Sequence, residues 1–398
     1  MKCNIWDYEK RALPDILSFI VDNRGKTVPT TNSGHILIAT NCVRNENLFP
    51  SYDKVRFLSE ETYQHWFRAH PMPGDILFVC KGTPGRVCMV PDPVDFCIAQ
   101  DMVALRVNDD IVYNKYLLAV LRSARIQKQI EQTSVGDVIP HFKKSFFDQL
   151  LIPIPSFEIQ RVIGDYYFAF SEKMELNKKI NNHLYEIVNT YYTSSFNNTE
   201  CEMTTIGSYA ERIYSGGTPA TSNVAYWGGA FSWFSSGETR NRFVISTEKT
   251  ITQAGIDHSS TKLAGKHDIV MASAGQGFTR GQASMLLIDT YVNQSVIVIH
   301  AARNVLPYLF WNLANRYEEL RAISDSSSIR GSLTTKMLSA FEIPQVDKCS
   351  LLSFSDFAWS AISQIENNLL ENERLTDIRD ALLPKLMTGE ISFSDIDL

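Results

Sequence analysis

The chain repeats itself once, and this repeat limits the possible folds more than any other feature. The segment GDILFVCKGTPGR at 74–86 returns in altered form as HDIVMASAGQGFTRGQ at 267–282. Further matches keep the same order at an offset of about 190–194 residues: Gly25-Lys26-Thr27 with Gly216-Gly217-Thr218, Gln100 with Gln294, Tyr116-Leu117 with Tyr308-Leu309, and Ile152-Pro153 with Ile343-Pro344. Ordered matches at nearly one offset indicate a duplicated unit. The chain should therefore contain two copies of one fold.

Each copy has the same internal plan. Short β-branched runs bounded by Gly and Pro come first, a pattern typical of strands and turns. Segments 117–130 and 307–323 are predicted to be shorter helices, and a long helix follows each Ile-Pro pair. The predicted fold class is α+β, with two similar mixed α/β domains separated by two long antiparallel coiled-coil helices and related by a pseudo-twofold internal repeat. The predicted parts are 1–155 (first domain), 156–199 (first spacer helix), 200–345 (second domain) and 346–398 (second spacer helix and C-terminal tail).

Both long helices carry a seam whose members are spaced alternately by four and three residues. The first seam runs from Ile163 to Tyr191, and adding 191 gives a second from Phe354 to Leu382. This spacing is typical of a coiled coil. The central members, which we expect to join the two helices or hold a partner, are Met174, Asn177, Asn181, Leu184, Ile365, Asn368, Asn372 and Leu375.

The Asn residues fall in matching layers of the two seams. A slipped register would leave a buried amide without its partner, at a cost of about 1–3 kcal/mol. Pro384 is expected to end or kink the second helix. An alternative is that each helix packs only on its own domain, although such a helix usually carries a wider apolar stripe.

Charge and composition narrow the class of protein. No run of 18 uncharged apolar residues is present, and the seven Cys contain no CxxC pair, so we expect reduced thiols in a cytoplasmic protein with no membrane span. The net charge of −6 argues against nucleic acid, but residues 346–398 hold 4 basic and 10 acidic residues and account for all of it. The acidic helix should lie away from phosphate or meet a basic protein, while the domains are neutral overall.

A search for catalytic and metal motifs finds little. The chain has no Pro-Pro dipeptide of the kind that amino-methyltransferases carry, and neither HExxH nor GxSxG occurs. Gly25-Lys26-Thr27 lacks the earlier Gly of a phosphate loop. Cys80, Cys88 and Cys97 do not form a recognisable zinc pattern with nearby His residues, which favours buried thiols. We therefore expect a non-catalytic chain without a metal or cofactor of its own.

The remaining candidates are polar, glycine-rich loops at matching places in the two copies. Residues 81–86 and 274–282 each follow an apolar run, and they mix Gly with side chains that suit base edges and phosphates. Solvated hairpin tips are the alternative for any one loop. The predicted DNA-binding residues are Arg24, Lys26, Thr27, Lys81, Thr83, Arg86, Lys143, Lys144, Thr218, Ser236, Arg240, Gln276, Thr279, Arg280, Gln282, Arg330 and Lys336.

Several of these motifs together resemble a known family. They are Ser215-Gly216-Gly217-Thr218-Pro219 with Tyr226-Trp227-Gly228-Gly229 and Trp233, then Gly74-Asp75-Ile76-Leu77, the two Ile-Pro pairs that precede heptad helices, and the ending 382–389, LLPKLMTG. The chain resembles the specificity subunit of Type I restriction–modification enzymes over its whole length. The first copy departs from the pattern, with Gly25-Lys26-Thr27-Val28-Pro29 in place of Gly-Gly-Thr-Pro and no clear Tyr-Trp-Gly-Gly.

The resemblance implies two target-recognition domains, each of which reads half of an asymmetric, bipartite site in double-stranded DNA. It implies that the helices set the spacing and that two methyltransferase subunits, which carry S-adenosylmethionine, assemble around them. Two restriction subunits that use ATP and Mg would join that core. Two rivals stay open: a methyltransferase or nuclease with an atypical active site, and a two-headed scaffold that does not bind DNA.

Overall fold

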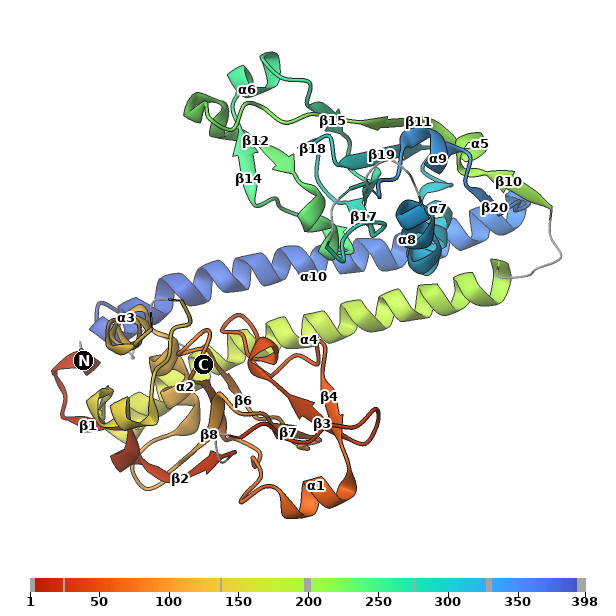
Figure 1. The fold of residues 1–398 in the computed structure, drawn as a ribbon. Coiled ribbons are helices and arrows are strands. Elements are labelled where there is room, and N and C mark those ends of the chain that lie inside the picture. Colours follow the sequence, from red (N-terminus) through yellow and green to blue (C-terminus); the bar gives the residue numbers. More distant parts are fainter. Residues whose placement is uncertain are drawn as a thin grey trace. The chain divides into compact units, whose positions relative to one another are not determined.

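The computed structural model describes residues 4–23, 26–136, 138–196, 202–274, 277–326 and 331–391. The chain divides into two compact units. Unit 1 contains 1–176 and 372–398, and unit 2 contains 177–371. The division crosses both long helices, α4 (Phe157–Phe196) and α10 (Lys348–Thr388), so each unit holds one globular part and a portion of each helix (Figure 1).

Unit 1 is built on two small sheets. The first sheet is antiparallel, in the order β2-β8-β5-β6, and the second has the order β4-β3-β7. A separate antiparallel pair joins β1 to β9. The strands are β1 (Lys10–Ala12), β2 (Leu17–Asp22), β3 (His35–Ile38), β4 (Arg56–Leu58), β5 (Ile76–Val79), β6 (Val87–Met89), β7 (Phe96–Ile98), β8 (Met102–Val107) and β9 (Leu151–Pro153).

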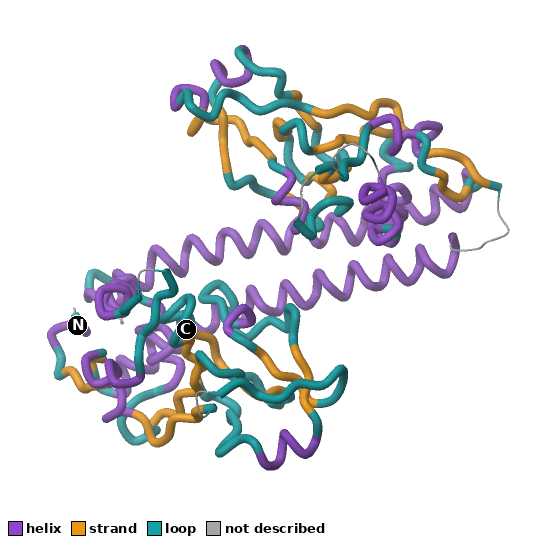
Figure 2. Tube along the Cα trace, in the orientation of Figure 1, coloured by secondary structure: helices purple, strands orange, loops and turns teal. Residues whose placement is uncertain are grey.

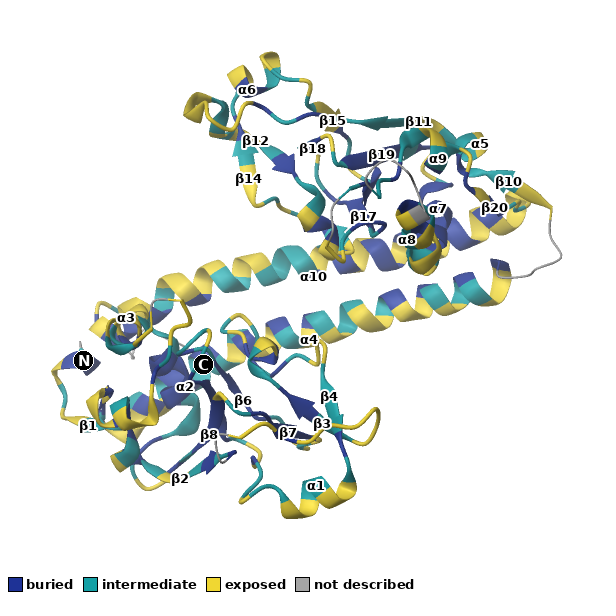
Figure 3. Ribbon diagram, viewed as in Figure 1, coloured by how far each residue is buried: buried dark blue, intermediate teal, exposed yellow. Residues whose placement is uncertain are grey.

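Strands β5, β6 and β8 of the first sheet are buried on both faces, which explains why they are almost continuously apolar, whereas the outer strand β2 is mostly half-buried or exposed (Figure 3). Ile76 and Phe78 join the core under the helices, whereas Leu77 and Val79 join the core between the two sheets. The helices of this part are α1 (Glu60–His65), α2 (Asn114–Arg122) and α3 (Ala124–Thr133), with 3-10 turns at Ile5–Asp7, Leu13–Ile16, Thr40–Cys42 and Lys144–Gln149.

The predicted helix at 117–130 is two helices, because Ser123 separates α2 from α3. Ser123 has an extended backbone, and its side chain accepts a hydrogen bond from the Ile126 amide at 3.5 Å. A serine in this conformation satisfies an orphan amide of the following helix. The bend allows both helices to bury an apolar face. The helix predicted at 307–323 is also two helices, α7 (Leu306–Asn315) and α8 (Tyr317–Ser326), with Arg316 between them.

Unit 2 has the same two sheets as unit 1, each with one further strand at its end, and Figure 2 draws the strands of both units in orange. Its first sheet has the order β11-β19-β16-β17-β13, its second has the order β14-β12-β18-β15, and β10 pairs with β20. The strands are β10 (Met203–Thr205), β11 (Ala210–Ser215), β12 (Trp227–Phe234), β13 (Phe243–Val244), β14 (Lys249–Ile251), β15 (Lys262–Ala264), β16 (Ile269–Ala272), β17 (Ala283–Leu286), β18 (Thr290–Val292), β19 (Val296–Ala301) and β20 (Glu342–Pro344). The other elements are α5 (Ile206–Tyr209), α6 (Gln253–Asp257), α9 (Thr335–Ser339) and the 3-10 turns Val224–Tyr226 and Ser236–Arg240.

The duplication predicted from the sequence is confirmed by the matching strand orders. The Ile-Pro motif has the same role in both units, since Ile152 pairs with Arg11 in β1 and Ile343 pairs with Thr204 in β10. In each unit the Ile-Pro motif therefore forms the last strand, which pairs with the first strand of that unit immediately before a long helix begins. The fold class predicted from the sequence, mixed domains with two long helices, is correct.

In unit 2 the two long helices contact each other along their predicted seams. The Asn368 amide donates to Oδ1 of Asn181 at 2.7 Å, and the Asn177 amide donates to Oε2 of Glu371 at 2.7 Å. Residue numbers rise on one helix as they fall on the other, so the segments are antiparallel. One predicted Asn layer thus pairs amide with amide, while Asn177 uses a carboxylate instead.

In unit 1 the same antiparallel contact continues with different partners. Asn372 donates to the Met174 carbonyl at 3.3 Å, and the Arg379 guanidinium lies 5.4 Å from the centre of the Tyr167 ring. Pro384 was predicted to end or kink the helix; the first of these two outcomes is wrong, because α10 continues to Thr388 with Pro384 inside it. Leu383 and Met387 belong to the core of unit 1, and their burial holds the last turn in helical form.

Candidate nucleic-acid interface

Several predicted DNA-binding residues of unit 1 lie at one edge of its first sheet. Because the strands are antiparallel, the end of β2 (Asp22 opposite Val103) and the end of β5 (Val79 opposite Met102) meet at that edge. The segments that leave the sheet there contain the sequence candidates Lys26, Thr27, Lys81, Thr83 and Arg86. We call this the unit 1 edge.

The segment before β9 is tied to the same edge. The Gly82 amide donates to the Pro140 carbonyl at 2.9 Å, and the Phe142 amide donates to the Cys80 carbonyl at 2.8 Å. Lys144 forms an ion pair with Asp22, at the end of β2. These bonds bring Lys144 and the exposed Lys143, both predicted DNA-binding residues, beside the β5–β6 loop.

Unit 2 has a matching edge, which we call the unit 2 edge. The end of β11 (Ser215 opposite Ile297) and the end of β16 (Ala272 opposite Val296) meet there. The Leu333 amide donates to the Ser273 carbonyl at 2.8 Å, the counterpart of the Phe142 bond in unit 1.

The 3-10 turn Ser236–Arg240 joins the unit 2 edge from the second sheet. The Asn293 amide donates to the Phe234 carbonyl at 3.2 Å, and the Thr239 hydroxyl donates to the Thr279 carbonyl at 3.5 Å. The unit 2 edge therefore collects the sequence candidates Thr218, Ser236, Arg240, Thr279 and Gln282.

The β5–β6 and β16–β17 loops end in the same turn. In unit 1 the Gly85 amide donates to the Val79 carbonyl at 3.0 Å and the Val79 amide donates to the Arg86 carbonyl at 2.9 Å. In unit 2 the Gly281 amide donates to the Ala272 carbonyl at 2.9 Å and the Ala272 amide donates to the Gln282 carbonyl at 3.2 Å. Both Gly residues have φ of 85°, which glycine adopts without strain. Thr83, Gly85 and Arg86 are thus structurally equivalent to Thr279, Gly281 and Gln282.

A Thr–Gln contact is also shared by the two edges. Gln100 donates its side-chain amide to the Thr27 hydroxyl at 3.4 Å, and the Thr218 hydroxyl donates to the Gln294 carbonyl oxygen. Each contact links the segment after the first strand of the sheet to the segment before the last strand in sequence. Both Thr residues are among the predicted DNA-binding residues, whereas Gln100 and Gln294 are not. Gln100 and Gln294 occupy matching positions of the sequence repeat, and this match was the signal that could have identified them.

Two arginines of the unit 2 edge are engaged within the protein. Arg280 is 7% exposed, donates to the Gly331 carbonyl at 2.7 Å and pairs with Asp325. Arg240 is exposed but pairs with Glu248 and donates to the Gly237 carbonyl at 3.0 Å. Among the described candidates of this unit Arg280 is the buried one, so its surroundings leave little room for a base.

The unit 2 edge also carries an exposed aromatic residue that is not among the predicted DNA-binding residues. Phe278 is 69% exposed, and its carbonyl accepts a hydrogen bond from the Tyr317 hydroxyl at 2.7 Å. Its position within a polar loop gave no periodic signal. A side chain of this kind is suited to stacking against a base or sugar.

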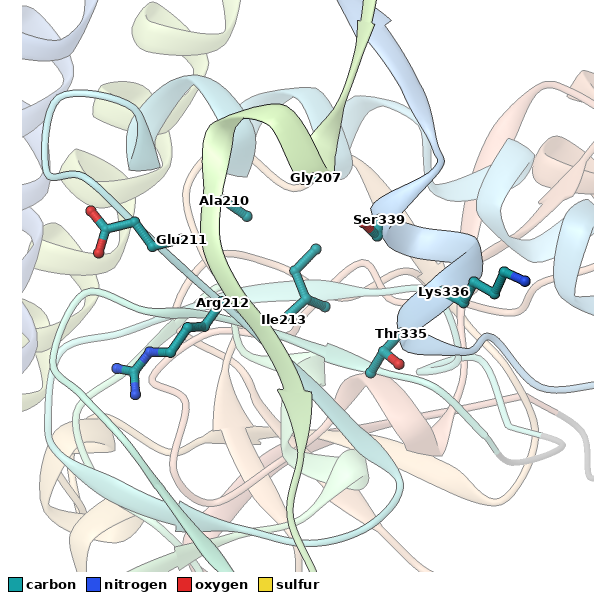
Figure 4. Close-up of a pocket in the computed structure, with 8 residues that line it drawn as sticks. All are labelled: Gly207, Ala210, Glu211, Arg212, Ile213, Thr335, Lys336 and Ser339. Carbon is teal, nitrogen blue, oxygen red and sulfur yellow. The ribbon is translucent and has the colours of Figure 1, made fainter.

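Lys336 lies at a different place, beside an open pocket of about 330 Å³ on β11 and α9. Figure 4 shows the side chains of Arg212 and Lys336 on opposite sides of this pocket, with Ile213 and Ser339 between them. The remaining sequence candidates, Arg24, Gln276 and Arg330, lie outside the described residues.

The described cysteines of unit 1, which are Cys42, Cys80, Cys88 and Cys97, are buried. Burial raises the pKa of Cys80, Cys88 and Cys97 to about 12. A thiol with such a pKa stays protonated near neutral pH and is a poor metal ligand. Across the described ranges, no group of three His, Cys, Asp or Glu side chains could hold a metal ion. None of the described helices is both long and apolar enough to span a membrane.

Comparisons with known proteins agree with this architecture. The family model of the Type I restriction modification DNA specificity domain matches residues 7–186. The HindI specificity subunit of a Type I restriction enzyme from Haemophilus influenzae is 22% identical over 80% of this chain and 86% of its own length. The EcoR124I/EcoR124II specificity subunit from Escherichia coli is 29% identical over 38% of each chain.

A solved structure shows the same fold over nearly the whole chain. The S subunit of a Type I restriction–modification system from M. genitalium covers 96% of both chains, with a TM-score of 0.59 and 16% identity. The duplicated domains, the paired helices and these comparisons lead to one conclusion: residues 7–186 match the Type I restriction modification DNA specificity domain, and the whole chain is similar to specificity subunits of Type I restriction enzymes.

Proposed function

We propose that the chain reads an asymmetric, bipartite site in double-stranded DNA, with one half-site for each unit. The observation that carries this proposal is the recurrence of one polar edge, with the same backbone frame and different side chains, in both units. Residues 1–155 and 200–345 are the two reading domains. Since the side chains of the two edges differ, the two half-sites differ as well.

The long helices serve as the spacer between the half-sites. The Asn181–Asn368 contact in unit 2 and the Asn372–Met174 contact in unit 1 fix the register of the two helices. Because the helices cannot slide along each other, the spacer keeps one length. A helix adds about 1.5 Å per residue, so the spacing of the half-sites follows from the number of heptads.

The chain itself makes and breaks no bond in this proposal. Two methyltransferase subunits assemble on the helices and supply S-adenosylmethionine and the methyl transfer, and restriction subunits supply ATP- and Mg-dependent steps, all in the cytoplasm. The exposed acidic side chains of α10, among them Asp356, Asp377 and Asp380, suit a basic surface on a protein partner better than they suit DNA.

The test of this function is to map methylated bases in host DNA with and without the gene. The expected result is a two-part motif, with a fixed gap, that disappears when the gene is deleted. The methylated motif should return with the intact chain. An unchanged methylome would refute DNA reading and favour the scaffold alternative. Methyl transfer by the isolated chain would instead favour an enzyme.

The spacer role has its own test. One heptad is inserted into α4 between Leu176 and Asn177, and one into α10 between Glu371 and Asn372, where the two units divide. Seven residues lengthen a helix by about 10 Å, so the gap in the methylated motif should grow by about three base pairs. The two half-sites themselves should stay the same. A motif that keeps its original gap would contradict the spacer role.

A further inference from the structure

The two edges differ at one structurally equivalent position of the shared turn, which holds Arg86 in unit 1 and Gln282 in unit 2. We propose that this position is a base-discriminating position in each half-site, with Arg86 selecting a guanine and Gln282 selecting an adenine. The inference rests on the proposed DNA-reading function and assigns part of its specificity to named side chains.

The other positions of the turn are unsuited to discrimination. Thr83 and Thr279 are identical, and so are Gly85 and Gly281, whose left-handed backbone serves the turn itself. At the remaining position unit 1 has Pro84, which has no polar side chain, and unit 2 has Arg280, which is buried and engaged by Asp325 and the Gly331 carbonyl. Only the position of Arg86 and Gln282 combines different polar side chains with partial exposure in both units.

The direction of the two side chains is the same. Val87 and Met89 pack in the core under the helices, whereas Cys88 and Val90 pack between the two sheets. Successive residues of a strand point to opposite faces, so Arg86 lies on the side between the sheets. In unit 2, Ala283 and Met285 face the helices while Leu286 faces the second sheet, and this places Gln282 on the corresponding side.

The surroundings of that side are polar and close to the other edge residues. The Val87 amide, next to Arg86, donates to Oδ1 of Asn45 at 2.8 Å. Beside Gln282, the Ser284 hydroxyl donates to the Asn241 carbonyl at 2.6 Å, directly after the turn Ser236–Arg240. The side chain at this position therefore emerges where segments from both sheets converge.

The state of Gln282 points to a ligand. Its Oε1 atom is buried and has no hydrogen-bond partner among the described residues. Buried polar atoms are nearly always hydrogen-bonded, and an exception calls for an explanation. An adenine would provide one when the half-exposed Gln282 side chain turns outward, because the exocyclic amino group of adenine donates to the Gln oxygen while its N7 accepts from the Gln amide. The Arg86 guanidinium has only donors, which match the O6 and N7 acceptors of guanine.

The experiment exchanges the two side chains within the intact chain. Arg86→Gln and Gln282→Arg are expressed separately in the host in place of the wild-type gene, and methylated sites are mapped across the genome. Arg86→Gln should change one guanine of the first half-site to adenine, with a shift in preference of about tenfold or more. Gln282→Arg should make the reverse change in the second half-site. In each case the other half-site and the gap should stay as they are.

The matched control is Lys143→Gln, which removes one cation from the unit 1 edge at an exposed position. It should lower methylation evenly over all sites without changing the motif, since a phosphate contact carries no base information. Thermal unfolding of each purified variant checks that the chain still folds. Arg86→Ala provides a second test: the first half-site should become indifferent at one base while its other bases stay fixed.

The outcomes separate the two proposals. A wild-type motif that remains unchanged in folded Arg86→Gln, Gln282→Arg and Arg86→Ala would overturn the inference and leave the DNA-reading function standing. Changes in both half-sites from one substitution would also overturn it. A wild-type chain that directs no methylation would refute the proposed function itself.

Discussion

The β5–β6 loop of unit 1 and the β16–β17 loop of unit 2 end in the same turn but are supported differently. The first spans 80–86, and the second spans 273–282 and is three residues longer. In unit 1, the Gln127 side chain on α3 donates to the Gly85 carbonyl at 2.8 Å. In unit 2 the longer loop is held by Arg321 and Tyr317 on α8, and by Arg280.

This difference shows how one backbone turn can carry two loops with different side chains. The backbone bonds that position the turn are the same in both units, while the added residues of unit 2 require additional side-chain anchors. Arg280 is such an anchor, although its residue type alone suggests a base contact. Residue type therefore predicts function poorly here unless the partners of the side chain are known.

The largest loss of unfolding free energy is expected from a substitution where a long helix packs closely against its globular part. A Cβ atom on Gly164 of α4 would lie 2.6 Å from the Tyr116 amide nitrogen of α2, whereas the equivalent residue of α10 is the buried Ser355. Gly164→Val should destabilise the chain by about 3 kcal/mol or more, because backbone must move. Ser355→Ala, the matched control, should change the unfolding free energy by less than about 1 kcal/mol. Denaturant unfolding measures both, and equal effects would contradict the closer approach in unit 1.

The next effect separates the two arginines of the loops. Arg280→Ala removes a buried guanidinium that binds Gly331 and Asp325, and should cost about 1–3 kcal/mol of unfolding free energy. Arg86→Ala should cost no more than about 0.5 kcal/mol, because its side chain is half-exposed. Chemical denaturation compares the two variants. If Arg86→Ala lost as much stability as Arg280→Ala, the result would contradict the proposal that Arg280 supports the loop while Arg86 contacts a base.

A smaller effect compares the polar layers of the helices. Asn368→Ala removes an amide–amide bond of 2.7 Å, and should cost about 1–2 kcal/mol. Asn372→Ala removes a longer contact of 3.3 Å to the Met174 carbonyl at a less buried position, and should cost about 0.5 kcal/mol. Thermal unfolding of the two variants and their double mutant provides the measurement. A larger loss of stability for Asn372→Ala than for Asn368→Ala would contradict this prediction and show that the polar contact in unit 1 is the stronger one.

The smallest effect concerns the shared Thr–Gln contacts. Thr27→Val and Thr218→Val should each change the unfolding free energy by about 0.5 kcal/mol or less, since both contacts are near the surface. If DNA is bound, each variant should weaken binding without altering the preferred bases. Serine in place of either Thr keeps the hydroxyl and should behave as the wild type. A changed base preference in the Val variants would show that Thr27 and Thr218 also contribute to base selection.

Much of the architecture could be predicted because duplication and heptad spacing are regular patterns. The seam from Ile163 to Tyr191 and its copy identified both helices and their antiparallel pairing. The break at Ser123 could not be predicted, because it depends on burying both flanking segments against one core. The continuation of α10 past Pro384 had the same cause, since tertiary contacts of Leu383 and Met387 outweigh the local preference of proline.

The equivalence of Arg86 and Gln282 was hidden for a different reason. The Asp75–Asp268 match gives an offset of 193, which would align Arg86 with Thr279. The longer loop of unit 2 adds three residues before the turn, and only the hydrogen bonds of Val79 and Ala272 restore the correct alignment. A uniform offset cannot identify equivalent residues within loops of unequal length.

The packing of Leu383 and Met387 into the core of unit 1 affects the order in which the chain can fold during synthesis. A ribosome delivers residues 4–176 first, yet the core of that unit stays incomplete until the last turn of α10 has emerged. Residues 177–371 form a continuous stretch and need no later segment. The second half of the polypeptide can thus finish folding before the first, the reverse of the usual N-to-C order.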